Sequence, residues 1–479
     1  MTTPSRSIAI IGAGLAGTGA ALALARAGFR VDLYSDRTRD SLLNNVPATG
    51  TAILFGASRT ADARIIDDPY AGIPAAHFAA SAAGLANPDN PTGVDSFPAS
   101  YSYEAQSVDP RLRADDRLDA FLDLADPDKD KDTHQDATDS AFHVGTVTPT
   151  DLDRIAASHD LTLLATGKGG LADAFATDHD RTPYTGPQRR VLTVTATGLP
   201  SDHVFTGRTG GEQSDRLTDA TGRPVNNALL SLHEEGEVFV GPYLHKDGLE
   251  SWVILAWARP GTATEQAFAE ATDAESALRI LQDLHRRVLP DVADDLDLLR
   301  PVDADPHSWL KGAVTARVRR PVGYTAGGHL VAALGDTAIA VDPIAGQGAQ
   351  LGDWQVAALV DGLVAAETAD QAWDADLLTD LFEAHWTDHG AAGVAVTSLF
   401  LGDPLYAEVA GAFFSNAATD PAYATALFSL FSEPAPALTL RTAEDVAALA
   451  ASFRNRTTER TTEQTTDRTT DRTTDKVTA

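Results

Sequence analysis

Residues 8–17 read Ile8-Ala9-Ile10-Ile11-Gly12-Ala13-Gly14-Leu15-Ala16-Gly17, and they decide the fold. The four apolar residues predict a short buried strand, and the glycines predict a tight turn into a helix over Thr18 to Ala27. A second strand over Val31 to Tyr34 follows. The segment therefore predicts a β-α-β unit, whose parallel crossover is right-handed.

The glycines of this turn have the spacing that a pyrophosphate needs. The backbone must bend sharply, approach the ligand without a Cβ in the way, and aim free helix amides at the negative charge. Gly12, Gly14 and Gly17 meet these needs in that order, and Leu15 and Ala16 lie between them. We therefore predict a dinucleotide site here, with a tight turn that binds no ligand as the alternative.

The end of the second strand is expected to hold the adenosine ribose. Ser35 stands where an acidic residue is usual, and Asp36 and Arg37 follow it. Asp36 is the candidate for binding the ribose hydroxyls, with Ser35 or a water molecule as substitutes. A surface turn at Asp36-Arg37 is the competing interpretation.

A second glycine motif lies far downstream. Gly335-Asp336 directly follows an apolar strand over 330–334, and Asp342-Pro343-Ile344-Ala345-Gly346-Gln347-Gly348 comes soon after. Asp336 is placed to bind a ribitol hydroxyl of FAD, and Gly346 and Gly348 let the backbone approach the flavin ring. A helix that starts near Gly348 then points its positive end at the electron-rich edge of the ring. Two such turns in one chain predict an FAD-binding protein.

Composition limits the remaining functions. The chain has 479 residues, a formal net charge of −31 and no cysteine. The acidic surface disfavours nucleic acid and membranes as partners, and serves solubility or the docking of a partner protein. Disulfides and cysteine nucleophiles are excluded, and the histidines show no metal-ligand spacing, so no metal is expected. We expect a cytoplasmic protein, because glycines interrupt the apolar N-terminal stretch that otherwise resembles a secretion signal.

The order of the predicted elements divides the chain into five segments. Alternating apolar residues between about Val191 and Ala258 indicate an antiparallel sheet inserted into the cofactor domain, and helices follow from about Trp354. A stretch from Asp123 to Asp139 that is rich in Asp, Lys and Thr is expected to be a solvated insertion. The segments are a first FAD-binding part (1–185), a β-sheet substrate domain (186–325), a second FAD-binding part (326–370), a C-terminal helical region (371–455) and a disordered Thr-rich repeat tail (456–479).

Several stretches in about the first 365 residues resemble the FAD-dependent aromatic monooxygenases, and most of all the oxygenase component of styrene and indole monooxygenases. The stretches keep the family's order, whereas the C-terminal helices match only in general character. They are Tyr34-Ser35-Asp36-Arg37, Leu42-Leu43-Asn44-Asn45-Val46, Ser107-Val108-Asp109-Pro110-Arg111-Leu112, Asp160 to Lys168, Pro187-Gln188-Arg189, and Gly335 to Gln350. The resemblance implies an α/β fold with a Rossmann-like FAD-binding domain of the p-hydroxybenzoate hydroxylase type.

The resemblance also assigns roles to residues that spacing alone does not single out. Asn44 would lie beside the flavin ring, with Leu43 and Val46 closing the oxygenation pocket, and Arg111 would contact the FAD phosphates. Without the resemblance, Asn44 could equally be a turn-forming residue near Pro47, and Arg111 a surface charge. The full predicted cofactor set is Gly12, Gly14, Leu15, Ala16, Gly17, Ser35, Asp36, Arg37, Asn44, Arg111, Thr166, Gly167, Gly335, Asp336, Pro343, Gly346, Gln347, Gly348 and Ala349.

The implied activity is that of a two-component monooxygenase. A separate NAD(P)H:flavin reductase would supply reduced FAD, and reaction with O2 through a C4a-(hydro)peroxyflavin would epoxidise or oxygenate an apolar aromatic alkene, an indole or a sulfide. The protein is a possible homodimer. The strand before Ala165-Thr166-Gly167 lacks the Asp-Gly pair of single-component hydroxylases, which favours external reduction. Ser41 replaces the arginine usual in the family, so flavin affinity or phosphate contacts are expected to differ.

Two other functions fit the same motifs. One is a single-component NAD(P)H-dependent aromatic hydroxylase, and the other is a flavin-fold protein that binds a partner or a lipid without turnover. A halogenase is disfavoured, because the Trp-x-Trp-x-Ile-Pro signature is absent. The candidate substrate wall, with ordinary sheet core as its alternative, consists of Val238, Phe239, Val240, Trp252, Ile254 and Trp257.

Overall fold

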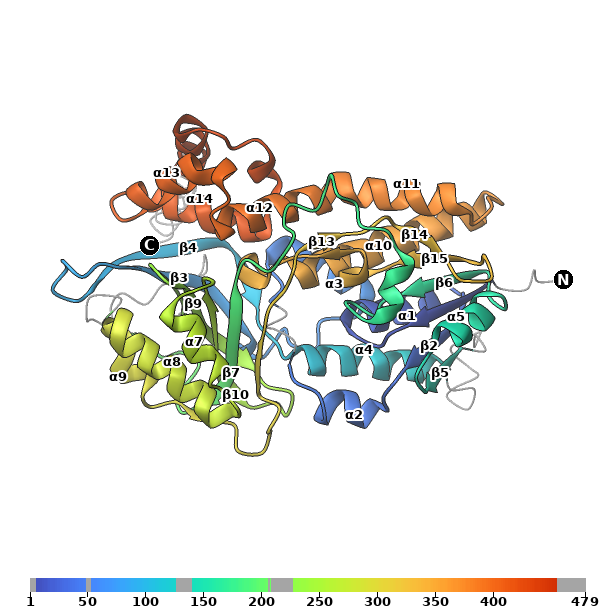
Figure 1. Cartoon of the computed structure of the whole chain (residues 1–479), viewed down its shortest axis with the longest axis horizontal. Coiled ribbons are helices and arrows are strands. Elements are labelled where there is room, and N and C mark those ends of the chain that lie inside the picture. Colours follow the sequence, from blue (N-terminus) through green and yellow to red (C-terminus); the bar gives the residue numbers. More distant parts are fainter. Residues whose placement is uncertain (1–5, 49–52, 126–139, 206, 208–226, 455–479) are drawn as a thin grey trace, which may run out of the picture.

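Two sheets organise the chain, whose computed structural model describes residues 6–48, 53–125, 140–205, 207 and 227–454 (Figure 1). The first sheet has the strand order β14-β15-β6-β1-β2-β5, parallel throughout except at β14. Its strands are β1 (Ser7–Ile11), β2 (Arg30–Ser35), β5 (Ala141–Val144), β6 (Leu161–Leu164), β14 (Val322–Tyr324) and β15 (Leu330–Ala333). The predicted α/β class is confirmed.

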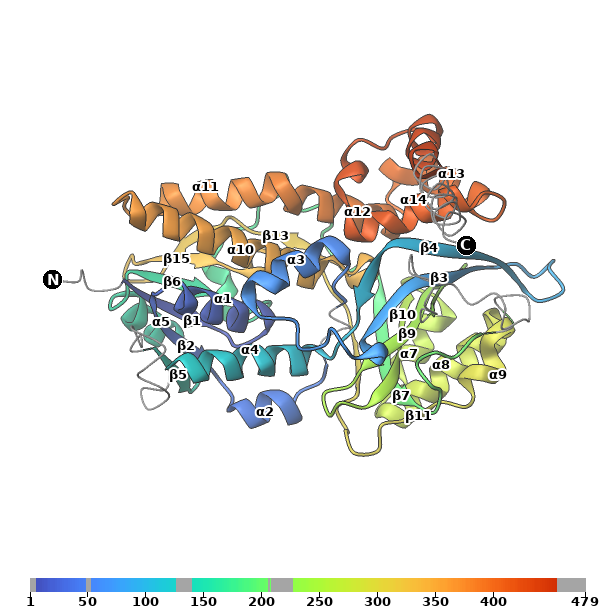
Figure 2. The same cartoon turned by 180° about the vertical axis from the view of Figure 1, so that it is seen from behind.

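Helices cover both faces of this sheet. The alanine- and leucine-rich α1 is buried along most of its length, because it lies between the sheet and three other helices, α3, α4 and α10 (Figure 2). Such all-round burial explains why α1 has no polar stripe. The helices of this half are α1 (Leu15–Arg26), α2 (Arg39–Asn44), α3 (Gly56–Ile65), α4 (Pro110–Ala125), α5 (Pro149–Ala156), α10 (Gln347–Thr368) and α11 (Ala375–His385).

A cluster of buried charges fixes α1 against its neighbours. We call Asp62, Arg113, Arg117 and Asp353, from α3, α4 and α10, the arginine cluster. Arg117 is 0% exposed; its Nη2 donates to Asp62 (2.6 Å) and Asp353 (2.8 Å), and its Nη1 donates to the Leu15 carbonyl (2.8 Å). Because these bonds join four helices, they fix the start of α1 relative to α10.

The second sheet has the order β11-β7-β10-β9-β8-β3-β4, with β12 also paired to β7. The predicted antiparallel pairing is confirmed for β7, β10, β9 and β8, whereas β3 runs parallel to β8. One face packs against α8, and the other faces the C-terminal helices. The strands are β3 (His77–Ala86), β4 (Val94–Gln106), β7 (Arg190–Thr197), β8 (Asn227–His233), β9 (Gly236–Leu244), β10 (Glu250–Ala258), β11 (Arg300–Pro301) and β12 (Trp309–Gly312).

Sheet membership refines the predicted segments. Strands β3 and β4 fall within 1–185, yet they complete the second sheet, so the first FAD-binding part is interrupted between His77 and Gln106. The helices of the second half are α7 (Ala263–Ala269), α8 (Ala274–Val288) and α9 (Ala293–Leu296), and β13 (Arg317–Val318) pairs with β16 (Ile339–Ala340). Of the expected solvated insertion over 123–139, residues 123–125 form the end of α4 and the rest lies outside the described residues, as does the repeat tail over 456–479.

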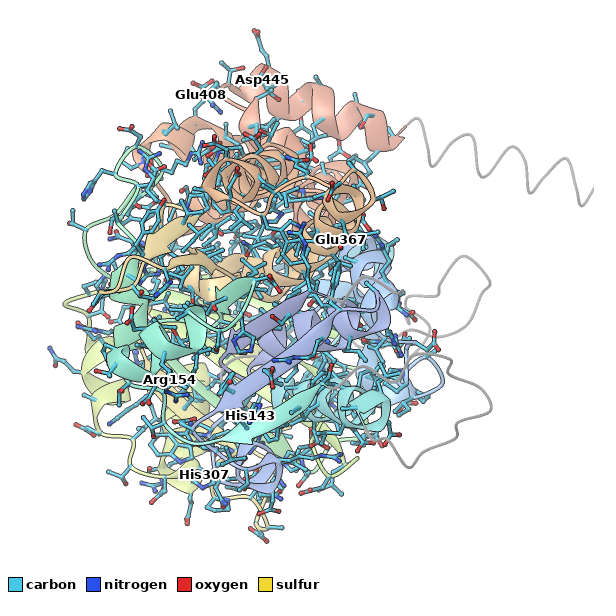
Figure 3. All side chains as sticks on the ribbon, turned by 90° about the vertical axis from the view of Figure 1, so that its right-hand side faces the viewer. His143, Arg154, His307, Glu367, Glu408 and Asp445 are labelled. Carbon is cyan, nitrogen blue, oxygen red and sulfur yellow. The ribbon has the colours of Figure 1, made fainter. Side chains whose placement is uncertain are left out.

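The predicted C-terminal helices are present as α12 (Ala391–Leu401), α13 (Ala407–Ala417), α14 (Pro421–Ser432) and a helical stretch over 443–454. They lie above β3 and β4 at one end of the molecule (Figure 1). Seen along the long axis, Glu408 and Asp445 of these helices lie together at the top, and His143 of β5 lies well below them (Figure 3). The C-terminal helices therefore form a third layer over the second sheet.

Candidate functional site

Three turns that are far apart in the sequence meet at the carboxyl ends of β1, β6 and β15. A Cβ at Gly12, where φ is +113°, would lie 2.5 Å from the Ala165 carbonyl oxygen. A Cβ at Gly335 would lie 2.6 Å from the Ala16 Cβ. The two glycine motifs are therefore in direct contact, at the edge of a parallel sheet where ligands bind in doubly wound folds.

Two helices begin at this edge without a side-chain cap. Gly14 is the N-cap of α1, and Gly346 is the N-cap of α10. By contrast, Thr38, Thr148 and Asp273 cap α2, α5 and α8 with side-chain oxygens. A Cβ at Gly14 would meet no atom within 4 Å. The first amides of α1 and α10, which include those of Leu15, Ala16, Gln347, Gly348 and Ala349, are thus suited to bind the phosphates and the electron-rich ring edge of a cofactor.

Asp336 offers a free carboxylate in the same place. Its side chain is exposed, and no hydrogen bond to it is found among the described residues. The surrounding protein limits the hydration of the carboxyl group and raises its pKa above the ordinary value, against the charges of Lys168 and Arg319. Its Oδ1 would lie 3.7 Å from a Cβ at Gly348. An acceptor in a recess with no protein donor fits a ribitol hydroxyl of FAD.

The loop after β6 completes this recess. The Gly167 amide donates to Thr337 Oγ1 (2.8 Å), and a Cβ at Gly167 would lie 3.9 Å from the Asp336 Cβ. Thr166 Oγ1 is buried without a partner in the described part of the chain. The structure therefore places Thr166 and Gly167 beside the second glycine motif, although their contacts to FAD remain a prediction.

At the end of β2, Ser35 and Asp36 differ in exposure. Ser35 is buried, and its Oγ accepts a hydrogen bond from the Arg37 amide (3.1 Å). Asp36 is exposed and forms an ion pair with the Arg37 side chain (3.2 Å). Of the two residues, Asp36 is thus the one whose side chain can reach a ligand. Its contact with the ribose stays a prediction.

Asn44 lies at the end of α2, a helix that packs against α4. Its Nδ2 donates to Asp40 (2.9 Å), and its Oδ1 accepts from Lys246 Nζ (2.9 Å). Leu43 and Val46 are both half-buried. The predicted placement of these residues beside the flavin ring is not tested by these contacts.

Arg111 is buried and paired. It is 5% exposed, and its guanidinium donates to Asp109 (2.7 Å), to Asp305 (2.6 Å) and to the Val46 carbonyl (3.2 Å). Its predicted contact with the FAD phosphates stays a prediction. The structure adds an anchoring role, because this side chain ties the segment that carries Val46 to the loop that carries Asp305.

An apolar cavity of about 40 Å³ adjoins the second glycine motif. It lies between the second sheet, the turn over Pro343–Gly346 (including η6, Pro343–Ala345) and the C-terminal helices. We call this space the aromatic cavity; its lining residues are Ile53, Phe55, Leu230, Phe239, Leu255, Trp257, Pro343, Ile344, Ala345, Gly346 and Phe431. A Cβ at Gly346 would lie 2.9 Å from the Phe55 ring, so the cavity and the proposed flavin turn share a wall.

The residues of the predicted substrate wall divide between the two faces of the second sheet. Phe239 and Trp257 line the aromatic cavity. The other four residues face the opposite side of the sheet, where they pack against α8; they are Val238, Val240, Trp252 and Ile254. Since side chains alternate along a strand, a list that mixes odd and even positions cannot lie on one face, and this part of the prediction is wrong.

Sequence reasoning missed the contribution of the C-terminal helices. Phe431 of α14 stacks on Phe55 with ring centroids 5.2 Å apart. The Phe431 carbonyl accepts hydrogen bonds from Gln347 (3.1 Å) and Gln350 (3.2 Å) in the first turn of α10. In the sequence, Phe431 is one of several aromatic residues in an apolar helix. No local signal could therefore have shown that it covers the cavity; we call it the lid residue.

No cluster of histidine, aspartate or glutamate suited to a metal ion occurs among the residues described. Within that same part of the chain, no helix combines the length and apolar character that crossing a membrane requires.

The chain is similar in sequence to known flavoproteins over parts of its length. A family described as glucose inhibited division protein A matches residues 7–54, which contain β1, α1, β2 and α2. Styrene monooxygenase StyA of Pseudomonas fluorescens is 26% identical over 210 residues, which are 43% of this chain and 45% of StyA. The match thus spans less than half of that relative.

Solved structures share the fold over nearly the whole chain. A flavoprotein/dehydrogenase from Cytophaga hutchinsonii is 12% identical, with 94% of this chain and 99% of that chain covered and a TM-score of 0.59. PqsL of P. aeruginosa in complex with 2-aminobenzoylacetate is 16% identical, with coverage of 88% and 99% and a TM-score of 0.53. CmlS, a flavin-dependent halogenase, is 14% identical, with coverage of 84% and 65% and a TM-score of 0.53. The chain is thus distantly similar to the FAD-dependent flavoprotein monooxygenases, and FAD is its cofactor.

Proposed function

We propose that the chain is a monooxygenase that binds reduced FAD from a separate NAD(P)H:flavin reductase and adds one oxygen atom of O2 to an apolar aromatic alkene, indole or sulfide. One observation carries this proposal: the aromatic cavity shares the Pro343–Gly346 turn with the flavin site. An apolar substrate in this cavity would meet the flavin ring across that turn. Cytoplasmic location and homodimer formation remain predictions.

The residues of the site bind and orient the reactants. Asp336 would accept a ribitol hydroxyl, and the free amides at the starts of α1 and α10 would hold the phosphates and the ring edge. When bound in its reduced form, FAD supplies the activation of O2. Phe55, Phe239 and Phe431 provide flat apolar walls that exclude water and orient an aromatic ring.

We assign a second wall of the oxygenation pocket to Leu43, Asn44 and Val46. Three bonds support a fixed position for this segment: Asn44 is held by Asp40 and by Lys246, and the Val46 carbonyl is held by Arg111. A segment fixed in this way can keep an amide group oriented toward the flavin ring.

The sequence of the loop after β6 supports the proposed dependence on an external reductase. This loop reads Ala165-Thr166-Gly167 and lacks the Asp-Gly pair that accompanies NAD(P)H use in single-component hydroxylases. We expect that NADH or NADPH alone will not reduce FAD bound to the purified chain, and that a flavin reductase with NADH will restore turnover. Direct reduction by either nucleotide would favour the single-component alternative instead.

The oxygenase proposal is tested by rapid mixing of the reduced FAD complex with oxygenated buffer. We expect an absorbance transient that outlives the reoxidation of free reduced FAD and decays faster when styrene or indole is present. Reoxidation at the rate of free FAD would contradict the proposal and favour a binding protein without turnover.

The Asp336→Asn variant tests the flavin site separately. Loss of the charged acceptor should weaken FAD binding about tenfold, because hydrogen bonds to charged groups contribute about 1.5–3 kcal/mol. The control is Asp67→Asn, an exposed residue in the loop after α3, for which we expect unchanged affinity. Equal FAD affinities of the two variants in calorimetric titration would remove Asp336 from the site.

A further inference from the structure

Trp257 has a polar atom that the protein does not use. It is 3% exposed, it lines the aromatic cavity, and its Nε1 has no hydrogen-bond partner among the described residues. A buried N–H without an acceptor costs about 1–3 kcal/mol. A donor left in this state beside a ligand cavity indicates that the ligand supplies the acceptor.

A second tryptophan on the same strand shows the ordinary case. Trp252 of β10 is 0% exposed, faces the opposite side of the sheet, and donates from Nε1 to the Leu199 carbonyl (3.1 Å). Trp373 also has a buried Nε1 without a partner, but it packs against Phe29 outside the aromatic cavity. Among these three side chains, Trp257 alone combines a free donor with a ligand cavity in the described structure.

The polar neighbours of Trp257 are already engaged. In the register of β9 and β10 it stands opposite Glu237, and both carboxylate oxygens of Glu237 accept hydrogen bonds from Arg189 (2.8 and 2.9 Å). Glu237 is 4% exposed and Arg189 is 6% exposed. This closed ion pair leaves the indole N–H available, and it places no free charge of its own at the cavity wall.

We propose, on the basis of the proposed function, that Trp257 Nε1–H donates a hydrogen bond to the substrate, and that the substrate is an aromatic compound with a neutral acceptor atom. Ring nitrogens, ethers and carbonyl oxygens have this chemistry, whereas styrene and other hydrocarbons do not. Trp257 is thus a specificity-determining residue. It selects one orientation of the ring in the aromatic cavity and so decides which edge of the substrate faces the flavin.

The test compares ligands that differ by one atom. Naphthalene, quinoline and isoquinoline have the same shape, and only the last two carry a ring nitrogen, which is uncharged at mildly alkaline pH. Their dissociation constants are measured by titration calorimetry on the protein loaded with oxidised FAD, without turnover. We expect at least one of the two nitrogen heterocycles to bind about fivefold more tightly than naphthalene, as one net hydrogen bond allows.

Two matched variants locate the donor. Trp257→Phe removes the N–H and should abolish the preference for the heterocycle, so that the affinity ratio falls to about one even if both affinities weaken. Trp252→Phe removes an N–H from the other face of β10 and should keep the ratio. The free energy of unfolding also distinguishes the two variants, because only Trp252→Phe breaks an existing hydrogen bond.

Three results would overturn the inference: equal binding of the three ligands by the wild type, a preference that survives in Trp257→Phe, or no binding of any of them. Each is independent of the oxygen reaction. A protein that shows the transient with O2 but no ligand preference is an oxygenase in which Trp257 is not a donor. A protein with the preference but no transient is an aromatic-binding flavoprotein without the proposed activity.

Discussion

Arg117 in the arginine cluster and Trp257 in the aromatic cavity are equally hidden from solvent, at 0% and 3% exposure. Both terminal nitrogens of Arg117 donate to protein oxygens, whereas Nε1 of Trp257 donates to none in the described chain. The Nε of Arg117 also lacks a partner in the described chain, but its guanidinium is paired with Asp62 and Asp353 and does not line the aromatic cavity, so its function is to hold helices together. The free donor of Trp257 lines a cavity, and a free buried donor at a cavity points to binding.

The arginine cluster should give the largest effect on stability. Arg117→Met removes the partner of Asp62 and Asp353 and leaves two buried carboxylates, so we expect a loss of about 3–5 kcal/mol in the free energy of unfolding. Urea denaturation measures this loss. The control Arg64→Met removes an exposed pair with Asp361 and should cost about 1 kcal/mol or less. Similar losses for both variants would mean that the cluster is not a structural clamp.

Asp342 directly precedes the Pro343–Gly346 turn of the aromatic cavity, and only one of its two carboxylate oxygens has a hydrogen-bond partner among the described residues. Its Oδ1 accepts from the Ile344 amide (3.1 Å), its Oδ2 has no partner among the described residues, and burial raises its pKa to about 7. A pKa raised in the folded state stabilises the fold below the unfolded pKa of 3.8, and this stabilisation is lost as the pH rises through 7.

Asp342→Asn should therefore remove part of the pH dependence of stability. As the pH rises from mildly acidic to mildly alkaline, the free energy of unfolding of the variant should increase relative to that of the wild type by on the order of 2–4 kcal/mol. Urea unfolding of both proteins across this range provides the measurement, and the other buried carboxylates cancel in the difference. If the difference in unfolding free energy between the two proteins did not change with pH, Asp342 would ionise normally in the folded protein.

A substitution in the turn that the cavity and the flavin site share should have the smallest effect on stability. In Gly346→Ala, the new Cβ meets the Phe55 ring in a left-handed conformation (φ +61°), so we expect a loss of about 1–3 kcal/mol and weaker FAD binding. Gly402→Ala, at φ +75° with open space around it, should cost about 1 kcal/mol from backbone strain alone. If thermal unfolding gives the same loss for both, the Phe55 contact contributes nothing.

The glycine turns were predictable because their requirements are local. Gly12 and Gly335 have backbone conformations and neighbours that admit no side chain, and this leaves a mark in the sequence. The strand β10 was also predictable, but its faces were not: alternation says that Trp252 and Trp257 point in opposite directions, and only the packing partners decide which one faces the cavity.

Other features had no reliable local signal. Strand β3 is rich in alanine and serine, which have weak strand preference, so its place in the second sheet was missed. Phe431 reaches the cavity from a helix far downstream. The ion pair of Arg111 with Asp305 depends on a contact across the fold, and no spacing along the chain predicts it.

The hydrogen bonds from Gln347 and Gln350 to the Phe431 carbonyl have a consequence for the order of synthesis. All predicted cofactor residues have been translated once Ala349 has left the ribosome, whereas the lid residue Phe431 comes some eighty residues later. We therefore expect a nascent chain to be able to take up FAD while its substrate cavity is still open on one side. Until α14 arrives to close the cavity, such a chain would hold a flavin that is accessible to water.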